Sequence, residues 1–268
     1  MNATAEEDRL GFFGPASVTW RVHTDPSFSV GGLRALLLQA LHPVAMDGVA
    51  RNSAAREDPW PRLVRTAAYV DTLTFGTRSD ALRAVRRVRG LHTRLGVDDP
   101  DLLLWVHCCE VDSLLSVARR SGVPLTDDDA DRYVAEQVTA ASLIGAAEAP
   151  DSVAALAAYF SRMRPVLVAT PEARDAARLV LRPPMPTWVR YLTPARPAWG
   201  GLAALAFASL PRWARRMYSM PAFALTDAAA TAGLRAFRQA VLPLPQRVRR
   251  SPIVWAGFDR VAAPSLTA

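Results

Sequence analysis

The fold class is decided by residues 58–96, which read DPWPRLVRTAAYVDTLTFGTRSDALRAVRRVRGLHTRLG. Apolar residues recur here every three or four positions in two segments, which is the period of an amphipathic helix. Asp58 supplies a capping carboxylate before a proline, and Gly76 ends the first segment. Ser79 begins the second segment, which runs to Gly96. The stretch therefore predicts two helices joined by a short turn.

The helical period continues through most of the chain, whereas alternating strand patterns are nearly absent. Further helices are expected over residues 31–50, from 100 onward, and over 126–144, 151–164, 171–182, 201–217 and 226–242. Pro43 should bend or interrupt the first of these, because proline cannot donate the backbone hydrogen bond. Five prolines indicate a loop-rich connection over 183–197. We expect an all-α fold over residues 1–268, a single globular domain of about eight to ten helices.

The composition excludes several classes of protein. The chain of 268 residues is 50% hydrophobic, but it has no apolar run of the roughly 20 residues that span a membrane. The acidic N-terminus lacks the pattern of a secretory signal, so a cytoplasmic location is expected. All 32 basic residues are arginine, scattered among acids without a recognition motif, so no nucleic-acid partner is expected despite the net charge of +7. The adjacent Cys108 and Cys109 are interpreted as buried hydrophobic residues.

Two helical faces carry groups that suit an iron porphyrin. Arg62, Arg65 and Thr66 share one face of the first helix, and Arg89 and His92 share one face of the second. A histidine nitrogen can bind the iron, arginines can neutralise the propionates, and a hydroxyl can line the distal side. These residues predict a haem pocket enclosed by the helices.

Two other histidines leave alternatives open. His42 precedes the break at Pro43, and His107 lies on the apolar side of its helix, so either could act as an acid or a base. Together with Glu110 or Asp112 they could instead form a non-haem metal site. A third alternative is a non-catalytic helical protein that binds haem or another ligand. The sequence has no Gly-x-Ser-x-Gly elbow, phosphate-binding glycine loop or dinucleotide fingerprint, which removes support for hydrolase, kinase and nicotinamide chemistry.

The chain resembles the bacterial branch of the MpaB/rubber oxygenase family, which includes latex-clearing proteins. The resemblance covers most of residues 11–120 and lies in six short motifs in the family's order. They are Gly14-Pro-Ala16, Leu36-Leu-Leu-Gln-Ala-Leu-His-Pro43, Asp58-Pro-Trp-x-Arg-Leu-x-Arg-Thr66, Phe75-Gly-Thr77, Arg86-Arg-Val-x-Gly-Leu-His92 and Leu103-Leu-Trp-Val-His107.

The resemblance implies an all-helical fold that binds b-type haem. It implies that His92 is the axial ligand and that Arg62, Arg65 and Thr66 line the distal side. Arg65 stands where the rubber enzymes have lysine, and an arginine that stays protonated is a poor metal ligand. The catalytic glutamate of those enzymes has no clear counterpart; His42 or Asp47 lies in roughly that region.

The expected function is that of a haem b-dependent oxidoreductase or oxygenase. Its partners would be oxygen or peroxide and a small-to-medium apolar organic substrate. His92 would bind the iron, while Arg89 and Arg62 would contact the cofactor. The expected catalytic residues are Arg62, Arg65, Thr66, His42 and His107.

Overall fold

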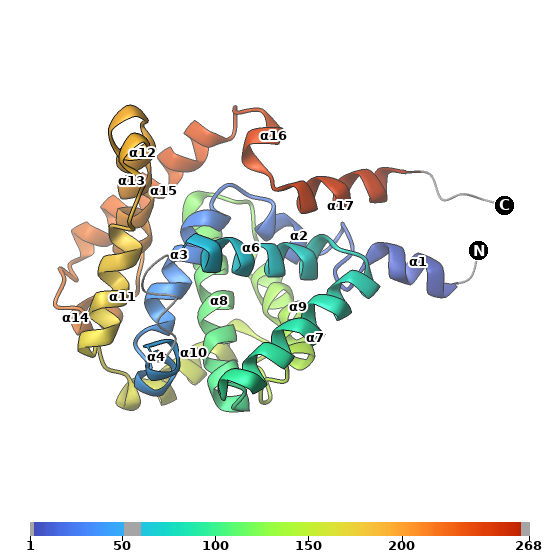
Figure 1. The fold of residues 1–268 in the computed structure, drawn as a ribbon, viewed down its shortest axis with the longest axis horizontal. Coiled ribbons are helices and arrows are strands. Elements are labelled where there is room, and N and C mark those ends of the chain that lie inside the picture. The colour runs from blue at the N-terminus through green and yellow to red at the C-terminus, as the bar shows by residue number, and fades with distance from the viewer. Residues whose placement is uncertain (1–2, 51–59, 264–268) are drawn as a thin grey trace.

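A computed structural model describes residues 3–50 and 60–263, and within these ranges every regular element is a helix (Figure 1). The elements are α1 (Ala3–Leu10), α2 (Val18–His23), α3 (Phe28–Gln39), α4 (Pro43–Ala50), α6 (Trp60–Phe75), α7 (Arg78–Leu95), α8 (Pro100–Ser121), α9 (Asp127–Ile144), α10 (Val153–Met163), the 3-10 turn η1 (Arg164–Val166), α11 (Pro171–Leu181), α12 (Thr187–Leu192), α13 (Ala195–Ala208), α14 (Arg212–Met217), α15 (Ala224–Val241), α16 (Gln246–Arg249) and α17 (Pro252–Ala262). Ten of these helices have 11 residues or more. The predicted all-α class is confirmed.

Local capping chemistry sets the ends of the predicted helices. The Thr126 hydroxyl accepts a hydrogen bond from the Asp129 backbone N–H at 3.0 Å. The Asp129 carboxylate in turn accepts one from the Thr126 backbone N–H at 3.1 Å. Such a reciprocal pair satisfies two N–H groups that a helix start leaves without partners. Gly96 ends α7 with a φ of 63°, a left-handed conformation that glycine adopts without strain. The start predicted at Ser79 is corrected to Arg78, because Thr77 is the residue that caps α7.

Proline positions explain three departures from a simple helical pattern. The predicted interruption at Pro43 is confirmed, since α3 ends at Gln39 and Pro43 is the first residue of α4. The single helix predicted over 201–217 is wrong: α13 ends at Ala208 and α14 begins after Pro211, whose extended backbone separates them. The proline-rich connection also contains the short helix α12, which the sequence pattern did not predict. Its residues have few inward-facing apolar positions, so no period was visible.

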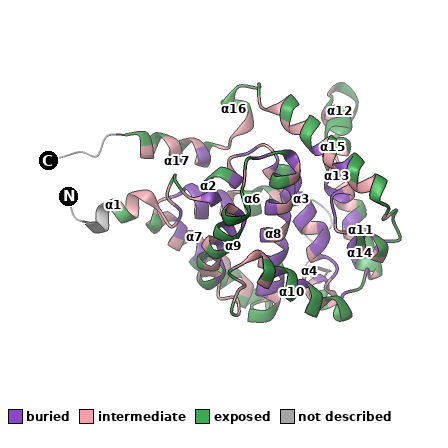
Figure 2. Ribbon diagram, turned by 180° about the vertical axis from the view of Figure 1, so that it is seen from behind, coloured by how far each residue is buried: buried purple, intermediate pink, exposed green. Residues whose placement is uncertain are grey.

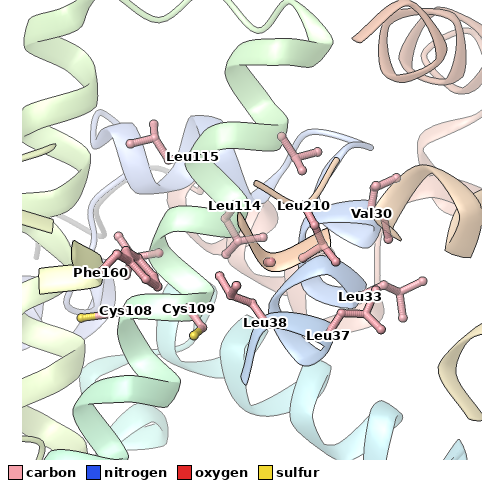
Figure 3. Packing of buried hydrophobic residues seen from close by; sticks show 14 of the residues in the cluster. Val30, Leu33, Leu37, Leu38, Cys108, Cys109, Leu114, Leu115, Phe160 and Leu210 are labelled. Carbon is pink, nitrogen blue, oxygen red and sulfur yellow. The ribbon is translucent and has the colours of Figure 1, made fainter. Parts of the chain in front are cut away.

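The core forms where α3 and α8 cross at the centre of the molecule (Figure 3). A Cβ atom on Gly31 would lie 2.8 Å from Leu114 Cδ2 and 3.2 Å from its Cα, so glycine allows the two helices to approach closely. Around this crossing, buried apolar side chains come from both helices and from their neighbours. Those labelled in Figure 3 are Val30, Leu33, Leu37, Leu38, Cys108, Cys109, Leu114, Leu115, Phe160 and Leu210.

The other helices cover this pair from two sides. α13 packs on α3, and α15 packs on both α13 and α8, forming a C-terminal layer together with α11. On the opposite side lie α2 and α9, with the closely packed pair α6 and α7 beyond them (Figure 1). Burial follows this arrangement: α3 and α8 are mostly buried, whereas α12 and α16 are mostly exposed (Figure 2).

Three arginines join the C-terminal layer to the central pair. Arg34, which is buried, donates to Asp112 Oδ2 at 2.8 Å and to the Ser209 carbonyl at 3.2 Å. Arg120 donates to the same carbonyl at 2.9 Å. Arg215, also buried, pairs with a carboxylate of α15 and donates to the carbonyl preceding Ser209. The end of α13 is therefore held by guanidinium groups from α3, α8 and α14.

α1 and α17 lie side by side at one end of the molecule. Arg9 donates to the Arg260 carbonyl at 2.7 Å, and Arg260 donates to the Arg9 carbonyl at 2.8 Å. In the described parts of the chain, we find no helix with the length and apolar character needed to cross a bilayer.

Candidate functional site

The α6–α7 hairpin brings the two predicted motifs together. The chain reverses over Gly76 and Thr77, and the two helices then run antiparallel in close contact. Arg62, near the start of α6, therefore meets the last turn of α7. Its positive charge is one of the causes that lower the pKa of His92. Arg62 and His92 therefore lie at the same end of the hairpin.

His92 is half-buried, and its environment keeps the imidazole neutral. Burial is the main cause that lowers its pKa; Asp98 acts in the opposite direction, and Arg62 adds to the lowering. The Nδ1 atom is buried and has no hydrogen-bond partner among the described residues. A buried ring nitrogen without a partner is uncommon in proteins. A neutral imidazole of this kind keeps a nitrogen lone pair for a metal or a polar ligand.

Arg62 and Arg65 form a pair of like charges on α6. Burial is the main cause that lowers the pKa of Arg62, and the charge of Arg65 is the second. Both side chains and Thr66 nevertheless retain exposed surface. The solvent-reached surface around Arg62, Arg65 and His92 is called the recess below. Neither arginine forms an ion pair with a described residue, so this recess can accept an anion.

α8 contributes two further titratable groups whose pKa values are shifted by burial. His107 and Glu110 are half-buried and lie one turn apart. Burial lowers the pKa of His107 to about 4 and raises the pKa of Glu110 to about 7. At neutral pH the imidazole is therefore uncharged, while the carboxyl is divided between its two protonation states.

Glu110 lies between two tyrosines from neighbouring helices. Tyr69, one turn after Thr66 on α6, has its pKa raised by burial and by the charge of Glu110. Tyr133 on α9 is fully buried, and its pKa is raised by burial, with Glu110 next in order. Tyr133 also hydrogen-bonds to His23 Nε2, with 3.1 Å between the two heavy atoms.

His23 extends this network away from the recess. Its Nδ1 lies 2.8 Å from Thr74 Oγ1, and burial lowers its pKa to about 3. The sequence prediction missed this chain of polar groups, which runs from Glu110 through Tyr133 to His23. A carboxylate within the apolar face of α8 was the only signal in the sequence that could have revealed it.

His42 lies beside the N-terminal part of α8. Its Nδ1 accepts a hydrogen bond from the Ala45 N–H at 3.4 Å, which caps the start of α4. Its ring centroid lies 5.9 Å from that of Trp105. Burial lowers the pKa of His42 and Asp99 opposes that effect, just as the adjacent Asp98 does for His92. The structure thus gives His42 a structural contact while keeping it near the same loop as His92.

Arg89 points to a different region. Its guanidinium carbon lies 3.4 Å from the position of a Cβ on Gly145, the residue that ends α9. It also lines a cavity of about 380 Å³ between α7 and α9, together with Arg86 and Ser142. The C-terminal end of a helix carries partial negative charge, which accounts for an arginine there. Arg89 as a cofactor-binding residue stays a prediction.

The non-haem metal alternative gains no support from the arrangement. Across residues 3–50 and 60–263, no three side chains of the His, Cys, Asp and Glu types come together as metal ligands would. Asp112, one of the acids considered for such a site, is paired with Arg34 at 2.8 Å. The recess therefore offers single nitrogen and oxygen donors and cations, as a site for a macrocyclic cofactor would.

One of three comparisons with known proteins identifies the family of the chain. No curated protein and no solved structure gives a significant match to the chain. A family model described as "ER-bound oxygenase mpaB/B'/Rubber oxygenase, catalytic domain" matches residues 20–242. That range includes the α6–α7 hairpin, all of α8 and α9, and the C-terminal layer. The chain belongs to the family of mpaB and rubber oxygenase catalytic domains.

Proposed function

We propose that the protein is a haem b-dependent oxygenase in which His92 binds the iron. The observation that carries the proposal is the α6–α7 hairpin, which brings the start of α6, with Arg62, to the end of α7, where the charge of Arg62 helps to lower the pKa of His92. Family membership supports an oxygenase reaction. The substrate would be a small-to-medium apolar organic molecule, and oxygen or peroxide would be the oxidant.

The donor groups of the recess fit an iron porphyrin. His92 is neutral, and its Nδ1 lacks a hydrogen bond from the described residues, so the ring is available for coordination. Arg62 and Arg65 have no acidic partner in the described part of the chain and would neutralise the two propionates. When bound, haem would supply the redox chemistry with oxygen or peroxide.

The surrounding residues would then handle protons and exclude water. Glu110 can hold or release a proton on its carboxyl oxygen near pH 7, because burial raises its pKa to about 7. His107 stays neutral at that pH and can donate or accept a hydrogen bond. Thr66 offers a hydroxyl beside Arg65. Val64 and Val106 are exposed and add apolar surface close to these groups, which suits an apolar substrate.

A hemin titration followed by visible spectroscopy tests the proposal. The wild-type protein should bind hemin stoichiometrically and show a Soret band, and His92→Ala should lose that band. His107→Ala is the matched control, because it removes a half-buried histidine from the same region, and its spectrum should be retained. Full hemin occupancy in the His92→Ala protein would contradict the ligand assignment.

A second pair of variants tests the role of the cations. Arg62→Ala should bind hemin several-fold more weakly than the wild type, because an unpaired propionate would remain in the recess. Arg86→Ala, which removes an exposed arginine on the α9 side of α7, should bind as the wild type does. Equal affinities in the two variants would show that Arg62 does not contact the cofactor. Oxygen consumption by the loaded protein with apolar test substrates would then report on the reaction itself.

A further inference from the structure

The short helix α12 carries its large apolar side chains on the outside of the molecule. Trp188, Tyr191 and Leu192 are 64%, 67% and 81% exposed. Their spacing of three and four residues places them on one face of the helix. An amphipathic helix of a water-facing protein normally turns this face towards the core. Here α12 projects at the edge of the C-terminal layer, and the face is turned outwards (Figure 2).

The opposite side of α12 borders an apolar groove. Val189 and Met185 line it from the α12 side, and Trp199 and Leu202 line it from α13. The groove has a volume of about 630 Å³ and reaches Trp60, in the first turn of α6. The indole N–H of Trp60 is already bonded to a backbone carbonyl at 2.7 Å. The lining is therefore almost entirely hydrocarbon.

The segment that carries this surface contains arginines but no acids. Residues 176–226 contain seven arginines and no aspartate or glutamate, although the chain as a whole has 25 acids. Three of the seven pair with acids that flank the segment. Arg182, at the end of α11, and Arg196, in the first turn of α13, are exposed on the two sides of α12 in the sequence. The exposed apolar face lies within a segment that is entirely basic.

We infer that α12 is a docking surface for an anionic lipid bilayer. Trp and Tyr favour the boundary between headgroups and hydrocarbon, and Leu192 would insert below it. Arg182 and Arg196 would contact the anionic headgroups.

A second copy of the chain is a poorer occupant for this surface. In a symmetric dimer the same patch lies on both sides of the interface. Arg182 and Arg196 would then approach the arginines of the other copy, with no acid from the same segment to compensate. Like charges in an interface oppose association. An anionic membrane supplies the missing negative charge.

Vesicle co-sedimentation tests the inference, and it needs neither haem nor turnover. The wild-type protein should sediment with vesicles of mixed phosphatidylglycerol and phosphatidylcholine, and about 25-fold less with pure phosphatidylcholine, because each of the two arginines near an anionic surface strengthens binding about fivefold. Raising the salt to 1 M should release the protein, because screening shortens the range of the charges. The combined variant Trp188→Ser, Tyr191→Ser and Leu192→Ser should lose at least about tenfold in partitioning.

Two controls separate this docking from non-specific adhesion. Phe223→Ser with Leu225→Ser removes two residues that are 72% and 81% exposed at the other end of the C-terminal layer, and it should partition as the wild type does. Arg182→Gln with Arg196→Gln keeps the apolar face, but it should lose the preference for anionic vesicles.

Two results would overturn the inference. One is equal partitioning of the α12 variant and the wild type. The other is self-association of the wild type without lipid that the α12 variant abolishes, which would make this face a protein interface. Circular dichroism and thermal unfolding confirm that each variant folds, because all the replaced side chains are exposed.

Discussion

Replacing Glu110 with glutamine should change how the stability of the protein depends on pH. Burial raises the pKa of this carboxyl from 4.5 to about 7 in the folded protein. The folded state therefore binds a proton more tightly than the unfolded state, so stability falls as the pH rises from about 4.5 to about 7. At 1.36 kcal/mol for each pKa unit, the loss amounts to about 3 kcal/mol above pH 7.

The matched comparison is urea denaturation of the wild type and Glu110→Gln, both without haem, at several pH values between 4.5 and 8. The glutamine cannot ionise, so the variant should gain about 3 kcal/mol relative to the wild type over this range. The histidines with lowered pKa values, His23 and His107, destabilise both proteins equally on acidification and cancel in the difference. Glu148→Gln, at an exposed position after α9, controls for the loss of one negative charge.

The outcome that would refute this reasoning is a constant difference in unfolding free energy between the wild type and Glu110→Gln at all pH values. Glu110 would then ionise as a solvated carboxyl does, and it would not lie in the recess. A difference that grows as the pH falls would have the wrong sign and would indicate an ion pair instead.

Replacing Gly31 with alanine should destabilise the protein by about 1–3 kcal/mol in urea denaturation, because the new methyl group would collide with α8. Gly32→Ala has open space around the new methyl group and should stabilise the protein by about 0.5–1 kcal/mol. Equal effects of the two substitutions would contradict the close approach of α3 and α8. Thr126→Ala should cost about 1 kcal/mol in thermal denaturation, because it removes one half of the capping pair of α9, and an unchanged melting temperature would count against that role. Cys108 and Cys109 are buried, and burial raises the pKa of Cys108 to about 12, so a thiol reagent should label neither residue until denaturant is added; rapid labelling of the native protein would place them at the surface.

Local chemistry explains which helices could be predicted from the sequence. Capping by Thr126 and termination at Gly96 depend on neighbours within four residues, so the sequence carries the complete signal. The same holds for the break at Pro43, which depends on a missing N–H group. By contrast, α12 has only six residues and lies among prolines, so it is too short for its apolar spacing to predict a helix.

The candidate site was predictable only where the contact is set by the hairpin. A turn at Gly76 between two helices of similar length brings the start of α6 and the end of α7 together, so the motifs of Arg62 and His92 share one end of the hairpin. The charge of Glu110 on α8 adds to the effect of burial in raising the pKa values of Tyr69 on α6 and Tyr133 on α9. Nothing in the local pattern relates those residues, so only the folded arrangement reveals them.

The three arginines around the end of α13 have a consequence for any ligand that enters the apolar groove. A guanidinium keeps its proton at every pH at which proteins stay folded, so acid or alkali cannot loosen this junction as it can alter Glu110. These hydrogen bonds connect the end of α13, a helix that lines the groove, to α3, α8 and α14. Filling the groove would therefore press on the same helices that surround His107.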